Sequence, residues 1–376
     1  MSSVTLRGSA TGAADAPDRI VVAFPEVHAD ARIELVLNAT VRVPDDESVA
    51  DLPPSLGRLE LWPTSAMSGP GVPEAWVHDP GVVVPLWQTE ATWISFSCGY
   101  PFLVMVGAGA VNAITGEPWS PEPDFDRQNY LEAPDQPWLD GFPADPDEAA
   151  AGTVRQFVAA PLGRGYTAEE QLTDAPAVGG LTLVVAPLRA EHHVPVPDWE
   201  AMPLAPGSGP DGGPVMAFSA APPPEALGLG GGGRIRQIVA EAEHPAGHWD
   251  LDAARTVRVH IADAESWERL TGRAPHPAPA SAADYTAGGG VWFELEQDGA
   301  ALDPTGSPVA GLESVGTVAR RRGEVFPPED EAVGPHPVIR IRRRPGGVSG
   351  EYRVDAGHPT GSGDGGGGHP AAARGD

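Results

Sequence analysis

The feature that most constrains this chain is the spacing of its glycines and prolines, which divide the apolar residues into short segments. The 376 residues include 47 glycines and 43 prolines. Short apolar segments lie between them at 20–24, 59–62, 82–87, 92–96 and 102–106. Residues 31–43 alternate polar side chains with Ile33, Leu35 and Leu37, as expected of a half-buried strand. Short apolar runs bounded by turn residues predict β-strands rather than long helices.

Two parts of the sequence follow a similar order. Leu103 to Gly116 aligns without gaps with Val259 to Gly272, and each ends in an aliphatic residue followed by Thr-Gly. This indicates a tandem duplication. We predict a mainly β fold of two related sandwich- or barrel-like units with short helices. The expected organisation is N-terminal strands at 1–50, a first β unit with a dense central stretch at 51–178, a second β unit at 179–330, a C-terminal strand segment at 331–354 and a disordered tail at 355–376.

Charge and lysine content exclude several functions. The formal net charge is −28, and such a surface repels nucleic acid and anionic membranes. All 24 basic residues are arginine, so no residue can form a Schiff base or serve as a Walker A or kinase lysine. We therefore expect no cofactor of those classes, no nucleic-acid partner and no membrane partner.

The single cysteine, Cys98, allows no intramolecular disulfide and no cysteine-based metal site. Its flanks have strand character, which favours a buried structural thiol over a nucleophile. No run of apolar residues is long enough to span a membrane, and no basic and apolar leader opens the chain. These features predict a soluble, cytoplasmic protein.

Other motifs are weak. Val106–Asn112 approaches a dinucleotide fingerprint, but Pro118 stops the helix that such a site needs. Residues 203–233 are rich in Pro, Gly and Ala and predict a flexible loop. His244 and His248, with Asp250 and Asp252, have ligand-like chemistry, and His192 precedes a second histidine. Because Pro245 and Gly247 disfavour a helix here, we expect solvated loop histidines and no metal site.

The densest stretch, residues 136–188, holds the candidate site. As a pocket, it would offer an aromatic wall, an arginine and carboxylates. As structure, it would bury Arg155 in a strand paired with Asp140, because a buried charge needs a partner. The Tyr166 hydroxyl would then bond to backbone, and Thr167 would form a capping box with Glu170. The candidate binding residues are Trp138, Asp140, Arg155, Gln156, Tyr166 and Glu170.

Several motifs carry a resemblance. Gln136–Gly141 (QPWLDG), Val154–Val158 (VRQFV) and Val111–Glu117 (VNAITGE) resemble a family of uncharacterised microbial proteins. The likeness covers most of residues 20–330. The resemblance implies one shared architecture and no particular reaction.

Two functions remain open at this stage. The first is a non-enzymatic binding or structural protein that can self-associate as a homo-oligomer, favoured by the absence of a nucleophile, metal or phosphate motif. The alternative is a hydrolase or carbohydrate-active enzyme that uses Asp140 with Glu169 or Glu170 as its carboxylate pair. Carboxylates converging in one cleft would favour the enzyme.

Overall fold

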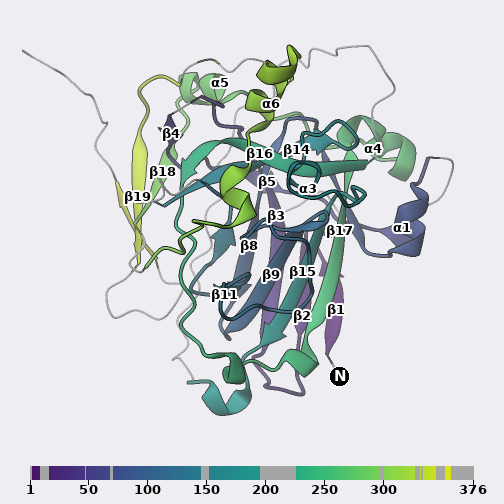
Figure 1. Cartoon of the computed structure of the whole chain (residues 1–376), viewed down its shortest axis with the longest axis vertical. Coiled ribbons are helices and arrows are strands. Elements are labelled where there is room, and N and C mark those ends of the chain that lie inside the picture. The colour runs from purple at the N-terminus through teal and green to yellow at the C-terminus, as the bar shows by residue number, and fades with distance from the viewer. Residues whose placement is uncertain are drawn as a thin grey trace, which may run out of the picture.

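The computed structural model describes a β-rich body with a few short helices (Figure 1). The described residues are 2–8, 17–46, 48–67, 71–144, 152–194, 226–296, 300–326, 331, 333–343 and 352–356. Each α-helix among them has between five and eight residues. The prediction of a mainly β fold with short helices is confirmed. The expected tail lies outside the described residues from position 357 onward.

The described strands form one large hydrogen-bonded network and one small sheet. The antiparallel spine of the network runs from β1 through β2, β3, β8, β14, β16, β17 and β15 to β9. In Figure 1, β14 and β16 run across the upper part of the body, above the long strands. This pair therefore joins the β3–β8 set to the β15–β17 set. The spine strands are β1 (Ser3–Arg7), β2 (Arg19–Ala23), β3 (Arg32–Thr40), β8 (Ala91–Cys98), β9 (Phe102–Ala108), β14 (Thr153–Pro161), β15 (Leu181–Pro187), β16 (Ala226–Arg236) and β17 (Arg255–Asp263).

Shorter elements complete the body. Two short strands add in parallel, β4 to β16 and β7 to β17, whereas the other short strands of the network pair antiparallel. The remaining strands of the network are β4 (Val49–Ala50), β5 (Ser55–Arg58), β6 (Trp62–Pro63), β7 (Val82–Leu86), β10 (Val111–Asn112), β11 (Leu131–Ala133), β12 (Trp138–Leu139) and β13 (Gly141–Pro143). The helices are α1 (Glu74–His78), α3 (Ala168–Leu172), α4 (Ala264–Thr271), α5 (Ala282–Ala287) and α6 (Val315–Arg322), with 3₁₀ turns η1 (Thr64–Ala66), η2 (Ala190–His192), η3 (Ala246–His248), η4 (Leu251–Ala253) and η5 (Pro308–Gly311).

The strand sequences explain where the core sits. In β3, the side chains of Ile33, Leu35 and Leu37 are fully buried and alternate at first with more exposed neighbours, as predicted. Every residue of β9 is buried, which matches its continuous apolar run rather than an alternating one. The core therefore lies between the strand sets, with β9 in its interior.

The prediction that the glycine-rich residues 203–233 form a flexible loop is wrong in part. Residues 203–225 lie outside the described residues, but β16 occupies 226–236 and pairs with β14. Glycine is required here by close approach of backbone. A Cβ on Gly230 would lie 2.6 Å from the carbonyl oxygen of Tyr166, and one on Gly233 would lie 2.1 Å from that of Pro44. The run is therefore a buried strand whose lack of side chains lets other segments pack directly on it.

Buried glutamines fasten the segment after β16 to residues 128–140. We call the side-chain amides of three residues the glutamine clamp: Gln128, Gln136 and Gln237. They form hydrogen bonds to the backbone of the other segment, in place of the hydrogen bonds of a regular strand pair. All three side chains are at most 8% exposed. The bonds are Ala242 N–H to Gln128 Oε1 at 2.8 Å, Gln128 Nε2 to Ala240 O at 2.8 Å, Ala240 N–H to Gln136 Oε1 at 3.0 Å and Asp140 N–H to Gln237 Oε1 at 3.0 Å.

The ends of the chain carry further strands. Residues 3–7 form β1, which pairs with β2 in the register Thr5 to Val21. A separate three-stranded sheet contains β18 (Trp292–Glu296), β19 (Val338–Arg343) and β20 (Tyr352–Ala356). The strand segment expected at 331–354 corresponds to β19 and most of β20.

The predicted duplication stays a prediction. The two aligned segments each begin with a buried strand, β9 and β17, but β9 continues into a hairpin with β10 whereas β17 continues into helix α4. Strands of both predicted units also pair with each other, since β9 lies beside β15. The unit boundaries expected at 178 and 179 likewise stay predictions.

Candidate functional site

The carboxylate of Glu169 is buried and fully engaged by backbone. Glu169 is the second residue of helix α3, and its side chain is 2% exposed. It accepts N–H groups from Ala110 at 2.9 Å, Val178 at 2.9 Å and Gly179 at 2.8 Å. These donors come from the β9–β10 hairpin and from the entry to β15. Glu169 therefore ties three segments together, and its oxygens point at amides of the fold rather than into a cleft.

Gly109 makes room for this carboxylate. Its φ is +59°, and a Cβ there would lie 2.2 Å from Cδ of Glu169. The glycine-rich Val106–Asn112 segment, which resembled a nucleotide fingerprint, thus receives a glutamate carboxylate from the same chain. The sequence offered no signal for this contact, because the two residues are 60 positions apart.

The predicted capping box at the start of α3 is confirmed. Thr167 accepts from the Glu170 N–H, and Glu170 accepts from Thr167 N–H and hydroxyl and from Gly165 N–H at 2.9 Å. The carboxylate of Glu170 is therefore occupied in capping the N-terminus of the helix. The neighbouring Tyr166 is fully buried, but its hydroxyl donates to the Glu324 carboxylate and not to backbone as expected.

Asp140 has a different partner from the one predicted. Its carboxylate accepts a hydrogen bond from the amide of Gln237, not from Arg155. The side chain is 4% exposed, and burial raises the pKa of Asp140 to about 7, opposed in part by the Gln237 bond. Arg155 lies half-buried in β14, opposite Phe142 of β13 and Arg234 of β16. The expected buried pair of Arg155 and Asp140 is wrong because Gln237, 97 residues away, occupies the carboxylate.

The two remaining candidates are also held by the fold. Gln156 is 1% exposed. Its side-chain amide accepts a hydrogen bond from Val43 N–H at 3.0 Å and donates one to Val41 O at 3.0 Å, as the backbone of a neighbouring strand would. Trp138 is half-buried in β12 and packs edge-on to Trp93, with ring centroids 6.3 Å apart.

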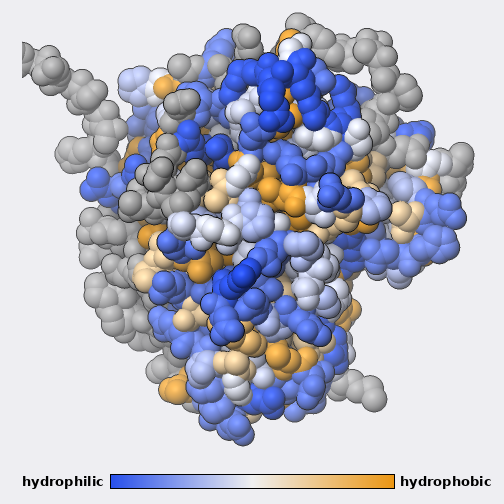
Figure 2. Space-filling model, in the orientation of Figure 1, coloured by the Kyte–Doolittle hydropathy of each residue, from blue (hydrophilic) through white to orange (hydrophobic). Residues whose placement is uncertain are grey.

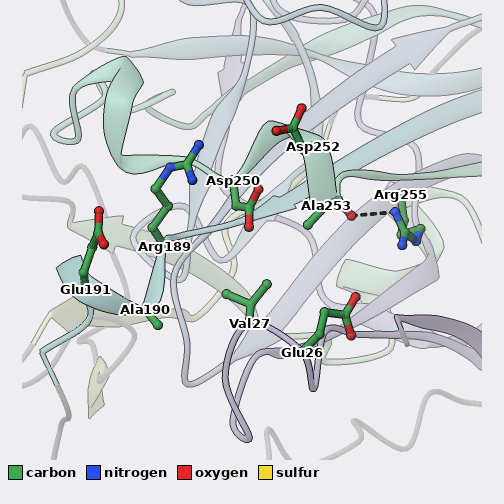
Figure 3. A pocket seen from close by; sticks show the side chains of 9 residues that line it. All are labelled: Glu26, Val27, Arg189, Ala190, Glu191, Asp250, Asp252, Ala253 and Arg255. Atoms are coloured by element: carbon green, nitrogen blue, oxygen red, sulfur yellow. Dashed lines mark hydrogen bonds between the residues drawn. The ribbon is translucent and has the colours of Figure 1, made fainter.

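An open concavity lies at the end of the body formed by the loops that precede β3 and β17 and follow β15. It has a volume of about 500 Å³, and none of the six candidate residues lines it. Figure 3 shows Arg189 and Glu191 on one side, Glu26 and Arg255 on the other, and Asp250 between them. Its full lining is Glu26, Val27, Arg189, Ala190, Glu191, Asp250, Asp252, Ala253 and Arg255. Loops at one end of packed sheets are a usual place for recognition residues.

Histidines gather beside this concavity. The rings of His192 and His248 stack with centroids 3.8 Å apart, and His244 lies 6.0 Å from His248. His193 packs against Tyr100 at 4.4 Å and His28 at 5.1 Å. A hydrogen bond to Glu132 raises the pKa of His244, whereas burial lowers the pKa values of His248 and His193. The sequence identified the histidines in separate loops but not their convergence.

The surface is polar on the face shown in Figure 2, where hydrophilic residues surround small, separate apolar areas. Among the described residues, no group of three or more His, Cys, Asp or Glu side chains could hold a metal ion. No helix in the described part of the chain is long and apolar enough to cross a bilayer. Comparison with family models, curated proteins and solved structures finds no match to this chain.

Proposed function

We propose that this chain is a non-enzymatic binding protein whose recognition surface is the open concavity at the loop end. One observation carries the proposal. The carboxylates expected to be catalytic, Asp140, Glu169 and Glu170, all accept hydrogen bonds that hold the fold together, whereas four other carboxylates line the concavity. Charged groups held in an open hollow by turns of a rigid β body suit recognition.

The charge of the concavity favours a cationic partner. Four carboxylates and two guanidinium groups line it, so the acidic side chains are in excess. The chain as a whole has a net charge of −28, which attracts positively charged partners and repels anionic ones. The proposed ligand is an arginine- or lysine-rich segment of a protein. A cytoplasmic setting is part of the proposal, since Cys98 is a free thiol.

Fluorescence anisotropy with a labelled hexa-arginine peptide tests this function. We expect binding that weakens as salt is raised and that is lost in the double variant Asp250→Asn with Asp252→Asn. The double variant Glu122→Gln with Asp126→Asn serves as the control, because it removes the same two charges at exposed residues that do not line the concavity. Equal affinity for wild type and the variant at Asp250 and Asp252, or no binding at low salt, would contradict the proposal.

Self-association is the second part of the proposal, and β1 supports it. Among the described strands, β1 pairs only with β2, so its other edge presents backbone donors and acceptors. Thr5 lies at its middle. Sedimentation velocity at rising salt should show dimers in the wild type, because salt screens the repulsion between acidic copies. Thr5→Pro should remove them, and a monomer at every salt concentration would contradict this part.

The enzymatic alternative has less support. It requires Asp140 and Glu169 or Glu170 to share a cleft with substrate. The hydrogen bonds of all three carboxylates count against that requirement. Hydrolysis of chromogenic glycosides by the wild type, lost in a folded Asp140→Asn variant, would favour the enzyme over the binding protein.

A further inference from the structure

We propose that the concavity releases its ligand in acid, because protonation of packed histidines separates the loops that form it. This regulation rests on the proposed function, since it acts on the same surface. The loop after β15 contains η2 and supplies Arg189 and Glu191 to the lining. One pair of histidine rings holds this loop to the loop before β17, and another pair holds it to the loop before β3.

The first pair lies where the loop after β15 meets the loop before β17. The rings of His192 and His248 stack with centroids 3.8 Å apart at an interplanar angle of 12°. The backbone N–H of Arg189 donates to the carbonyl oxygen of His248 at 2.8 Å, and the N–H of Asp250 donates to that of Pro187 at 2.9 Å. Arg189 and Asp250 both line the concavity (Figure 3). The stacked rings therefore help to set the spacing of two lining residues.

The second pair joins the loop after β15 to the loop before β3. The rings of His193 and His28 lie 5.1 Å apart, and both pack against Tyr100, at 4.4 Å and 5.4 Å. Val27, next to His28, lines the concavity from this side. Imidazoles pack in this way while at least one ring of a pair is neutral, whereas two imidazolium rings at such distances repel each other.

In each pair, one ring has no acceptor for an additional proton. Nδ1 of His193 and Nδ1 of His248 are buried, and neither makes a hydrogen bond with a described residue. A protonated ring has a donor on both nitrogens, so protonation would leave a buried N–H group without a partner. Burial also lowers the pKa values of these two histidines. The packed arrangement of the loops therefore requires His193 and His248 to stay neutral.

The other groups around the pairs act against protonation of these two rings. A carboxylate oxygen of Glu191 lies 3.6 Å from Nε2 of His192, and one of Asp30 lies 3.6 Å from Nδ1 of His28, so these partner rings can carry a charge. His244 lies 6.0 Å from His248, and its hydrogen bond to Glu132 raises its pKa. A charge on a partner ring or on His244 repels a second charge beside it. Among the described residues, the titratable groups that face the two pairs are Asp30, Tyr100, Glu132, Glu191 and His244.

The direction and size of the effect follow from the lowered pKa values. In an open loop, a histidine titrates near its usual value of about 6.5. The packed arrangement is therefore fully stable above that pH and loses stability as pH falls below it. At pH 5.5, each histidine that must stay neutral favours the open arrangement by about 10-fold. His193 and His248 together favour it by roughly 100-fold.

Hydrogen exchange of the full chain at pH 8 and pH 5.5, corrected for intrinsic exchange rates, tests the opening without a ligand. We expect protection of the Arg189 and Asp250 amides to fall by roughly 100-fold at pH 5.5 in the wild type. The loss should be about 10-fold in His248→Gln and less than about 3-fold in His248→Gln with His193→Gln, because glutamine stays neutral. His78→Gln is the matched control for the single variant, since His78 is exposed on α1 and should leave the wild-type loss unchanged. Equal protection at both pH values in the wild type, or equal losses in the wild type and the double variant, would overturn the proposal.

Fluorescence anisotropy with labelled hexa-arginine at fixed salt tests the release. The wild type should bind the peptide more weakly at pH 5.5 than at pH 8, and the variant at His193 and His248 should bind it equally at both. Equal wild-type affinity at the two pH values would overturn the regulation and leave the proposed function standing. If the peptide does not bind at pH 8, the proposed function fails, and hydrogen exchange still decides whether the loops open.

A further measurement needs no variant that could fail to fold. Imidazole NMR signals of the wild-type chain should show His193 and His248 titrating below about 6.5. Titration of both at or above that value would also overturn the proposal. Circular dichroism at pH 8 establishes that each variant is folded before its exchange and affinity are compared.

Discussion

Replacing Asp140 with asparagine should change how stability depends on pH. The carboxyl group is buried, its pKa in the folded chain is about 7, and burial is the main cause. In the unfolded chain an aspartate titrates near 3.9. Between these two values the folded state binds the proton more tightly than the unfolded state. The contribution of Asp140 to the free energy of unfolding therefore falls as pH rises from about 4 to about 7.

The size of the effect follows from the pKa difference. Each pKa unit corresponds to about 1.4 kcal/mol, so about three units correspond to about 4 kcal/mol. That is a large part of the roughly 5–15 kcal/mol by which domains are usually stable. Asparagine carries no charge and keeps an oxygen that can accept from Gln237, so Asp140→Asn removes the ionisation cost while keeping the bond.

The assay is urea unfolding followed by circular dichroism at pH 4, 5, 6, 7 and 8. The stability of Asp140→Asn minus that of the wild type should be small near pH 4 and should grow to about 4 kcal/mol at pH 8. Asp126→Asn, at an exposed position, should give a difference that does not change with pH. A difference for Asp140→Asn that stays constant within about 1 kcal/mol across the range would refute the reasoning from burial.

Other substitutions test the local structure around α3 by guanidinium unfolding. Glu169→Ala leaves three backbone N–H groups unpaired and should cost about 3–6 kcal/mol. The exposed Glu268→Ala should cost less than about 0.5 kcal/mol, and similar losses in the two would contradict the role of Glu169. Gly109→Ala and Gly163→Ala both place alanine at positive φ, but only the first meets a neighbour, so it should cost clearly more than the roughly 1–2 kcal/mol of the second. Thr167→Ala should cost about 1 kcal/mol through loss of the helix cap, and a neutral result would argue against the capping box.

Local patterns in the sequence predicted local structure well. The alternation in 31–43 and the apolar run at 102–106 identified β3 and β9, and Thr167 with Glu170 identified the start of α3. These predictions succeed because the determining residues are neighbours in the chain. Each depends on strand periodicity or on a cap bond across three residues.

Long-range contacts could not be predicted in the same way. The pairing of Asp140 with Gln237 and of Glu169 with Ala110 joins residues far apart, and nothing near either carboxylate announces its partner. The strand β16 was missed because glycine has a low strand propensity, yet close backbone packing required it. The convergence of His192 with His248 was invisible for the same reason of distance.

The four glycines at 230–233 have a consequence for the register in which β16 pairs with β14. Because the four residues are identical, a register shift of one residue in this part of β16 would again place glycine opposite the same residues of β14. The non-glycine residues that flank the run, Leu229 and Ile235 among them, distinguish the correct alignment from an offset one. A single added glycine would turn Ile235 from the core to the opposite face. The number of glycines in this run therefore sets the register of the residues that follow it in β16.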